Sequence, residues 1–262
     1  MSDSFISQVL DILTRYWPSM ALGVRNTLII SLTGTLIGLV IGLIVGGIRA
    51  IQLDYTASPA ARFGKRVLDA LGKAYIDVFR GTPMMVQAVF LYYALLNVMH
   101  WGKLTAAIFV ISVNTGAYMA EIIRSGIQAV DIGQTEAARS LGMSNIETMR
   151  RIVLPQAVQN AFPAIGNEFI VNIKDSSVLM IISIADLMFQ AKSIAGSTFQ
   201  FTATYGITAT IYFILTSIAA FILNWIEKQM NASETSFPQS DTSPYSMKLA
   251  TGKEKHHGHT SR

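Results

Sequence analysis

The chain contains long runs without a charged residue, and these runs limit what it can fold into. No Asp, Glu, Lys or Arg occurs between Arg25 and Arg49, and the residues between them are mostly apolar or glycine. A helix needs about 20 such residues to cross the hydrocarbon of a bilayer. The chain as a whole is 14% charged, whereas a soluble surface needs about 25–35% charged positions. The sequence therefore excludes a soluble globular enzyme and predicts an all-α integral membrane protein.

Five apolar segments are long enough to cross a membrane, and together they define a transmembrane domain over residues 21–230. The predicted spans lie at about 24–48, 81–101, 104–123, 164–187 and 205–226. The fourth span differs from the others because it contains charged residues, namely Glu168, Lys174, Asp175 and Asp186. Before the first span, apolar residues recur at helical spacing, which predicts an amphipathic segment over residues 1–20 at the outer membrane interface.

Lys and Arg are unevenly distributed between the segments that connect these spans. Fifteen of the 20 lie in residues 49–80, residues 124–151 and the region after residue 227. Since cytoplasmic loops retain Lys and Arg, this bias predicts an N-terminus outside and a C-terminus in the cytoplasm. Topology thus explains the basic pI, and no nucleic-acid partner is expected. Residues 231–262 are rich in Ser, Thr, Pro, Lys and His, which predicts a disordered cytoplasmic tail.

Glycine recurs every four residues on one face of the first span, at Gly34, Gly38, Gly42 and Gly46. In lipid, such stripes of small residues let another helix approach closely. The stripe predicts helix packing within one subunit; a dimer or pore seam is the alternative.

Polar residues occupy one face of the third span and one face of the fourth, at the spacing i, i+4, i+7. These residues are Asn114, Tyr118 and Glu121 in the third span, and Glu168, Asn172 and Asp175, with Ser176 adjoining, in the fourth. Because charges inside a bilayer cost roughly 2.5–3.5 kcal/mol each, we interpret the two faces as one solvated pathway for a zwitterionic solute. Lys174 lies about 100° further round the helix. Buried structural pairing is the alternative, and it is favoured for Glu121 and Asp186.

The segment between the third and fourth spans contains two helix-capping patterns. Asp131 precedes Gln134 at capping-box spacing, and Gly142 is suited to end the resulting helix in a left-handed conformation. Ser144 and Glu147 form a second capping box, and Pro155 is expected to stop the helix that follows. Residues 131–155 are therefore predicted to form two short cytoplasmic helices, with alanines at 137 and 138 offering a flat docking surface.

This loop resembles the EAA motif of ABC importer permeases at every position and spacing. The matching residues are Glu136, Ala137, Ala138, Gly142, Ile152, Leu154 and Pro155. Residues 79–83, 117–126, 166–169 and 174–177 are also similar to the polar amino-acid branch of this family, whose members include glutamine, glutamate, histidine and arginine systems. The resemblance extends over residues 23–230 and does not include the tail.

The resemblance implies a type I importer permease in a bacterial plasma membrane. Its partners would be two ATPase subunits, a second permease subunit (the same chain or a paralogue) and an extracytoplasmic amino-acid-binding protein. The residues implied in ATPase coupling are Glu136, Ala137, Ala138, Arg139, Gly142, Ile152, Leu154 and Pro155. Those implied in the substrate pathway are Asn114, Tyr118, Glu168, Asn172, Lys174, Asp175 and Ser176.

The chain has no G-x-x-x-x-G-K-[ST] phosphate loop. ATP and Mg²⁺ would therefore be bound by the partner ATPase, with no cofactor or metal in this chain and no covalent chemistry catalysed by it. The main alternative is an ion-coupled secondary transporter, with Glu168 and Asp175 as proton-coupling groups. Such transporters show inverted repeats and broken helices, and the sequence indicates neither. A non-transporting sensor or assembly factor is a further alternative, but it would leave the intramembrane acids without a purpose.

Overall fold

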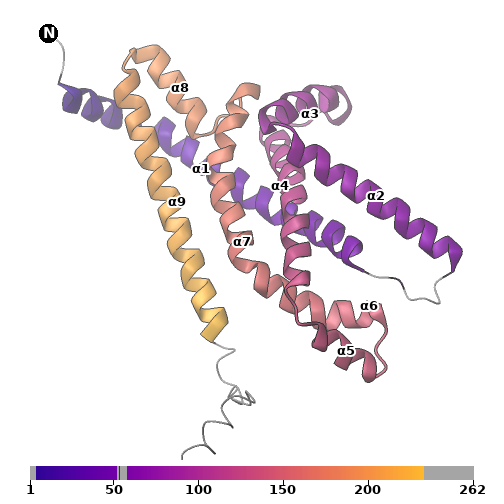
Figure 1. The fold of residues 1–262 in the computed structure, drawn as a ribbon. Helices are drawn as coiled ribbons and strands as arrows, with labels where there is room; N and C mark the ends of the chain where they lie inside the picture. Colours follow the sequence, from indigo (N-terminus) through magenta and orange to yellow (C-terminus); the bar gives the residue numbers. More distant parts are fainter. Residues whose placement is uncertain (1–3, 52, 54–57, 233–262) are drawn as a thin grey trace, which may run out of the picture. The chain divides into compact units, whose positions relative to one another are not determined.

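The computed structural model describes residues 4–51, 53 and 58–232, and in these ranges it contains helices and no strand. The elements are α1 (Phe5–Ala50), α2 (Pro59–Gly81), α3 (Met84–Met99), α4 (Lys103–Gln128), α5 (Ile132–Ser140), α6 (Asn145–Thr148), a π-helical turn (Met149–Val153), α7 (Leu154–Asp175), a 3₁₀ helix (Ser176–Ile182), α8 (Leu187–Thr198) and α9 (Phe201–Ala232) (Figure 1). The all-α prediction is confirmed. Met1–Trp225 forms one compact unit, to which the following description refers, and Ile226–Arg262 a second. From residue 233 on, the predicted tail lies outside the described residues.

Three helices in the described part of the chain, α1, α4 and α9, are each long and apolar enough to cross a membrane. Two further candidates are bent pairs: α2 with α3, at 115°, and residues 145–182 with α8, at 54°. The number of candidate spans therefore reaches the predicted five if each bent pair counts as one. The interpretation that the sequence contains no broken helices is wrong.

The first helix is longer than predicted. A separate amphipathic segment was expected over residues 1–20, but α1 is continuous from Phe5 to Ala50. It continues through Pro18. The reason lies in tertiary packing: Ile12 and Met20 are fully buried in a cluster with residues of α8 and α9, including Leu187. Burial of this kind outweighs the local cost of proline in a helix.

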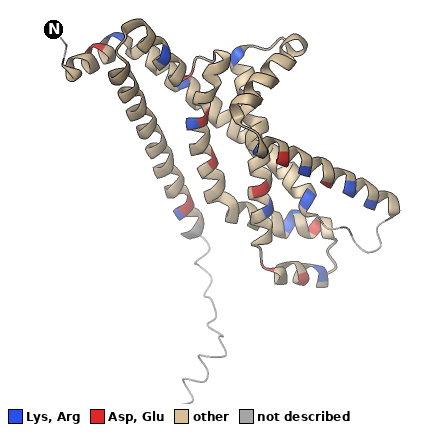
Figure 2. Ribbon diagram, turned by 45° about the horizontal axis from the view of Figure 1, so that its top comes forward, with Lys and Arg blue, Asp and Glu red and all other residues tan. Residues whose placement is uncertain are grey.

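A second difference is α2, which occupies residues that were interpreted as a connecting loop between the first two spans. Ser58 caps the helix by accepting a hydrogen bond from the Ala61 amide at 3.2 Å, and Pro59 occupies its first position. Serine followed by proline is a sequence signal for a helix start, and it was overlooked. Lys and Arg are spaced along α2 (Figure 2). Hydrophobic side chains of the same helix, such as Phe63 and Leu71, are exposed.

The glycine stripe packs α1 against α4, as predicted for a contact within one subunit. A Cβ atom built on Gly34 or Gly42 would collide with Ile111 or Met119, respectively. A Cβ on Gly38 would lie 2.8 Å from Cγ2 of Thr115, closer than two carbon atoms can approach. Glycine is therefore required on this face because the two helix backbones nearly touch.

Candidate functional site

In the loop between α4 and α7 both predicted residues, Asp131 and Ser144, cap a helix, but Asp131 caps through the Gly133 amide and not through that of Gln134, which a capping box requires. Oδ1 of Asp131 accepts a hydrogen bond from the Gly133 amide at 2.7 Å, which caps α5. At its other end Gly142 has φ +84°, its amide donates to the carbonyl of Arg139, and the Met143 amide donates to that of Ala138. This double hydrogen bond is the Schellman arrangement, and only its glycine adopts the left-handed conformation without strain.

The second capping structure is also present, but the helix that follows does not end where predicted. Oγ of Ser144 accepts a hydrogen bond from the Glu147 amide at 3.3 Å. The helix then continues through a π-helical turn into α7, so the prediction that Pro155 stops it is wrong. The Leu154 amide donates to the Met149 carbonyl, five residues earlier, and this wider turn precedes the proline. A local change of register is one way a helix accommodates proline.

The surface of the loop differs from the prediction at one alanine. Ala137 is exposed, but Ala138 is only 5% exposed and therefore offers no docking surface. Glu136, Arg139, Gly142 and Pro155 are exposed, and Ile152 and Leu154 are half-buried.

Three large apolar side chains that sequence reasoning missed are instead displayed by this loop: Ile132 is 74% exposed, Leu141 84% and Ile146 67%. An isolated large apolar residue in an otherwise polar, capped loop was the available sequence signal. These three side chains are candidates for contact with another protein.

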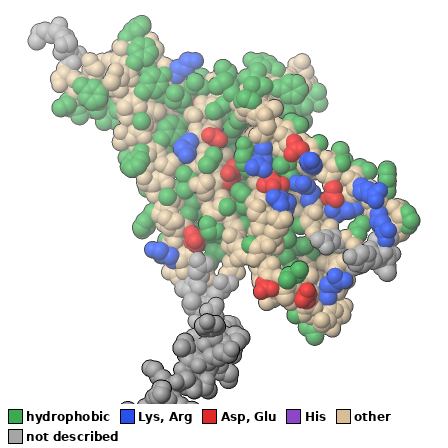
Figure 3. All heavy atoms as spheres, in the orientation of Figure 1, with side chains coloured by type: hydrophobic (Ala, Val, Ile, Leu, Met, Phe, Trp, Pro, Cys, Tyr) green, Lys and Arg blue, Asp and Glu red, His purple; other side chains and the backbone are tan. Residues whose placement is uncertain are grey.

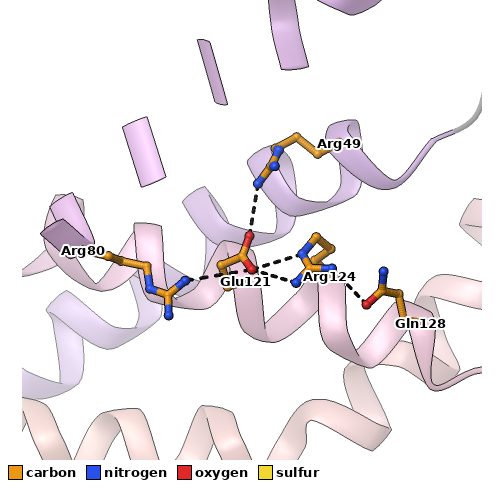
Figure 4. A network of polar contacts seen from close by, with 5 residues as sticks. All are labelled: Arg49, Arg80, Glu121, Arg124 and Gln128. Carbon is orange, nitrogen blue, oxygen red and sulfur yellow. Dashed lines mark hydrogen bonds and ion pairs between the residues drawn. The ribbon is translucent and has the colours of Figure 1, made fainter. Parts of the chain in front are cut away.

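Glu121 of α4 lies at the centre of a charged network with three arginines from three helices (Figure 4). Its Oε1 accepts a hydrogen bond from Arg49 of α1 at 3.1 Å, and its Oε2 accepts two from Arg124, the shorter at 2.8 Å. Arg80 of α2 is 3.9 Å from Oε2, and its guanidinium lies over the Tyr118 ring, 5.4 Å from the ring centroid. Glu121 is therefore a structural ion-pair residue, as favoured from sequence, and it joins α1, α2 and α4.

The side chain of Asn114 takes part in a hydrogen-bond network at the bend between α2 and α3. Its Nδ2 donates to Oε1 of Gln87 at 2.8 Å. The side-chain nitrogen of Gln87, Nε2, donates in turn to the backbone carbonyls of Phe79 and Thr82, each at 2.9 Å. These bonds satisfy backbone groups that the bend leaves without helical partners, a requirement inside a membrane. In this structure Asn114 positions the bend.

Asn172 has a similar role between α7, α1 and α4. Its Nδ2 donates to Oγ1 of Thr35 on α1 at 2.8 Å, and its Oδ1 accepts from Oγ1 of Thr115 on α4 at 3.1 Å. Ser31 donates to its backbone carbonyl at 3.0 Å. The side chain is almost fully buried. Asn172 thus connects α7 with both α1 and α4, and it does not share a solvated surface with Asn114.

The charged residues of α7 are more exposed than Asn172. Glu168 and Asp175 are half-buried and influence each other electrostatically, and the positive charge of Arg80 acts on Glu168. Lys174 is exposed and acts on Asp175. Charged side chains of both signs gather in the middle and right of the face shown in Figure 3, whereas hydrophobic side chains dominate its upper part. Glu168, Asp175, Lys174 and Arg80 form the candidate pathway group.

Helix geometry changes directly after this group. Ser176, which is fully buried and donates to the Ile173 carbonyl, begins the 3₁₀ helix, and Ser183 ends it with φ +58°. Asp186 is buried and caps α8 by accepting from the Phe189 amide at 2.9 Å, so it is structural, as favoured from sequence. Within the described residues no group of three His, Cys, Asp or Glu side chains could hold a metal ion.

Three long apolar helices, two bent helix pairs and an exposed, capped loop are together typical of a membrane permease subunit. Residues 55–231 match the family described as "Binding-protein-dependent transport system inner membrane component", and the chain belongs to this family of ABC importer permeases.

Curated relatives agree with this assignment. The chain is 36% identical over 220 residues to the glutamine transport system permease protein GlnP of Escherichia coli (strain K12), a match that covers 82% of this chain and 95% of the relative. It is 38% identical over 169 residues to the probable amino-acid permease protein YxeN of Bacillus subtilis (strain 168), covering 63% and 75% of the two chains. Both relatives are named as permeases.

Solved structures have the same fold. A chain in the structure described as an amino acid ABC transporter with histidines superposes with a TM-score of 0.73 at 36% identity, covering 87% of this chain and all of that chain. A chain of the MetNI methionine ABC transporter in an inward-facing conformation gives a TM-score of 0.71 at 20% identity, covering 82% and 97%, and shows likeness of fold. The predicted type I importer fold is therefore confirmed.

Proposed function

We propose that this chain is the permease subunit of an ATP-driven importer that moves a polar amino acid into the cytoplasm by alternating access. The observation that carries the proposal is the exposed, doubly capped loop over residues 131–155, which displays Ile132, Leu141 and Ile146 to a partner. The relatives named as amino-acid permeases support the choice of solute class.

The proposed coupling follows from the continuous helix that leaves the loop. From Ser144 the chain runs through α6, the π-helical turn and α7 to Asp175 without leaving helical structure. The 22 residues of α7 extend roughly 33 Å at 1.5 Å per residue. A displacement of the loop by an ATPase would therefore be transmitted along a stiff element to Glu168 and Asp175. Asn172, on the same helix, would carry the movement to α1 and α4.

The candidate pathway group has the charges that a zwitterionic amino acid needs. Glu168 and Asp175 can bind an α-ammonium group, while Arg80 and Lys174 can bind an α-carboxylate. The side chain of Tyr118, under the Arg80 guanidinium, would help to place that arginine. The presence of both signs of charge among these residues favours a zwitterion over a simple anion or cation.

The proposed assembly contains two ATPase subunits, a second permease subunit and an extracytoplasmic amino-acid-binding protein. ATP and Mg²⁺ would be bound by the ATPases. The loop over residues 131–155 would face the cytoplasm and the N-terminus the exterior, in agreement with the distribution of Lys and Arg. Family membership supports an ATPase and a binding protein as partners. We propose the number of subunits and the orientation of the chain in addition.

The bends in two candidate spans keep an ion-coupled secondary transporter as the second candidate, with Glu168 and Asp175 as the coupling acids. Reconstitution distinguishes the two. Vesicles containing the complete permease–ATPase complex, with the amino-acid-binding protein added outside, should take up radiolabelled glutamine, glutamate, arginine or histidine only with internal ATP. Uptake by the chain alone, driven by a proton or sodium gradient, would overturn the importer proposal.

A further inference from the structure

The N-terminal part of α2, residues 59–71, belongs to none of the hydrophobic clusters in the described chain. Hydrophobic packing of this helix begins further along, where Ile76 is buried in a cluster with Ala117 of α4 and Tyr75 packs against it. Tyr75 also donates to the Val113 carbonyl at 2.6 Å. The helix is therefore held against α4 at one end, and its other end is left open.

The open part carries a row of large apolar side chains. Phe63, Val67 and Leu71 recur at every fourth residue, so at about 100° per residue they lie within about 80° of one another round the helix. Phe63 is 68% exposed and Leu71 63%. These three residues are called here the apolar stripe. Leu68, beside the stripe, is also exposed.

Basic residues occupy the opposite side of the same helix. Arg62, Lys65, Arg66 and Lys73 lie about 200–300° round the helix from Phe63. Lys65 pairs with Asp69, the one acid in this stretch, at 2.6 Å. Arg66 and Lys73 are exposed and form no ion pair with any residue that the structure describes. An apolar stripe and a basic face on one helix match a surface that offers hydrocarbon beside negative charge.

The charged residues also decide how such a helix meets a membrane. By itself α2 is not among the helices that are apolar enough to cross, and it qualifies only as part of the bent pair with α3. A helix with a strongly charged face and an apolar face lies in the interface between headgroups and hydrocarbon. Anionic headgroups add attraction, because each Lys or Arg near such a surface contributes to binding.

We propose that residues 59–73 of α2 form an anchor in the headgroup region of anionic phospholipids. The apolar stripe enters the acyl boundary, and Arg66 and Lys73 pair with lipid phosphates. This anchor holds one end of a helix whose other end carries Arg80 of the candidate pathway group. Assignment of the anchor to the cytoplasmic leaflet rests on the orientation given under the proposed function.

The test measures the depth of a nitroxide spin label in the complete permease–ATPase complex, reconstituted into lipid nanodiscs. The chain has no native cysteine, so Phe63→Cys and Ala61→Cys each introduce one thiol. The unsubstituted complex, treated with the same label, gives the background from the partner subunits. Ala61 is exposed and lies about 200° round the helix from Phe63.

In discs of phosphatidylglycerol, the label at residue 63 should lie about 5–10 Å below the headgroup boundary. It should collide readily with oxygen, which concentrates in lipid, and rarely with a water-soluble nickel chelate. The label at residue 61 should show the opposite preference.

The requirement for negative charge is tested with the same label at residue 63. Replacing phosphatidylglycerol by phosphatidylcholine should expose it to the nickel chelate. At the phosphatidylglycerol fraction where buried and water-exposed label are equally populated, Arg66→Gln and Lys73→Gln should each lower the ratio of buried to exposed label on the order of fivefold. Arg15→Gln, which removes an exposed arginine of α1 on the opposite predicted side of the membrane, should leave the ratio unchanged.

Three results would overturn the proposal. The first is equal accessibility of the labels at residues 61 and 63. The second is a label at residue 63 that is shielded from both reagents, as a second permease subunit or an ATPase covering the stripe would produce. The third is unchanged burial in phosphatidylcholine. Because the readout is depth and not uptake, the anchor and the importer function can fail independently of each other.

Discussion

Replacement of Gly142 by valine tests whether the shape of the loop is necessary for transport. Gly142 has φ +84°, and a Cβ atom there would meet nothing within 4 Å. The cost of the substitution is therefore conformational and not steric. It is about 1–2 kcal/mol for a residue other than glycine, and more for a β-branched one. A change of 1–2 kcal/mol shifts the equilibrium between the native and the opened turn by a factor of about 5–30.

The opened turn loses the hydrogen bond from Gly142 to the Arg139 carbonyl and the one from Met143 to the Ala138 carbonyl. Because the turn is exposed, we expect Gly142→Val to insert into the membrane with an unchanged Tm but to lose most ATP-dependent uptake. Gly142→Asn should be intermediate, since asparagine tolerates this conformation. The assay is uptake by reconstituted complexes at matched protein content.

The matched control for this prediction is Gly64→Val in α2. A Cβ atom on Gly64 also meets nothing within 4 Å, but its φ lies outside the left-handed region. We expect uptake close to that of the wild type. Full uptake by Gly142→Val, or equal losses in the two valine variants, would refute the idea that the left-handed turn holds the docking loop in its working shape.

Three further predictions concern the membrane helices. Gly42→Leu should lower the free energy of unfolding by at least about 1–3 kcal/mol because the leucine side chain would overlap Met119. Gly47→Leu should leave it unchanged, since no atom lies within 4 Å of a Cβ on Gly47. Equal Tm values for the two variants would contradict the packing of α1 on α4. Asn172→Leu should cost about 1–3 kcal/mol through lost interhelical hydrogen bonds, measured as denaturant-induced unfolding, and an unchanged midpoint would show that these bonds are dispensable. Asp175→Asn should change the relative uptake of basic, neutral and acidic amino acids while leaving Tm near the wild-type value, and an unchanged preference would make this acid structural.

Local structure in the loop was predictable because it depends on residues close in sequence. The caps by Asp131 and Ser144, and the left-handed turn at Gly142, each require only a side chain or a glycine at a fixed offset from the helix end. The glycine stripe was equally readable, since its period of four residues identifies one face of one helix. Membership of the permease family followed from the loop motif and is confirmed.

The roles of the polar residues were less predictable, because the spacing fixes a helical face but not the neighbour that it meets. Asn114 faces Gln87, a residue hidden in an apolar run, and Asn172 faces two threonines. The sequence assigned both asparagines to the substrate pathway, whereas the structure uses their hydrogen-bonding groups to join helices. Arg80 was assigned to a loop, whereas it lies on α2, 3.9 Å from Glu121 and over the ring of Tyr118.

Two errors in the loop have the same origin. Ala138 was expected on the docking surface, but the direction in which α5 packs buries it. Pro155 was expected to end a helix, but the π-helical turn before it changes the register and lets the helix continue. Tertiary packing decides both points, and it cannot be read from residue spacing.

The central claim is that the loop over residues 131–155 is the contact through which a separate ATPase acts. The most direct measurement is site-specific crosslinking at Leu141, the most exposed of the three apolar side chains on the loop. The chain has no native cysteine, so Leu141→Cys introduces a single thiol. We predict that a maleimide–benzophenone reagent, attached to this thiol through its maleimide, photocrosslinks to C–H bonds of the co-purifying ATPase, and that the yield changes between nucleotide-free and ATP-bound complexes. Absence of a crosslink in both states, or labelling of intact cells at this position by a membrane-impermeant maleimide, would contradict the claim.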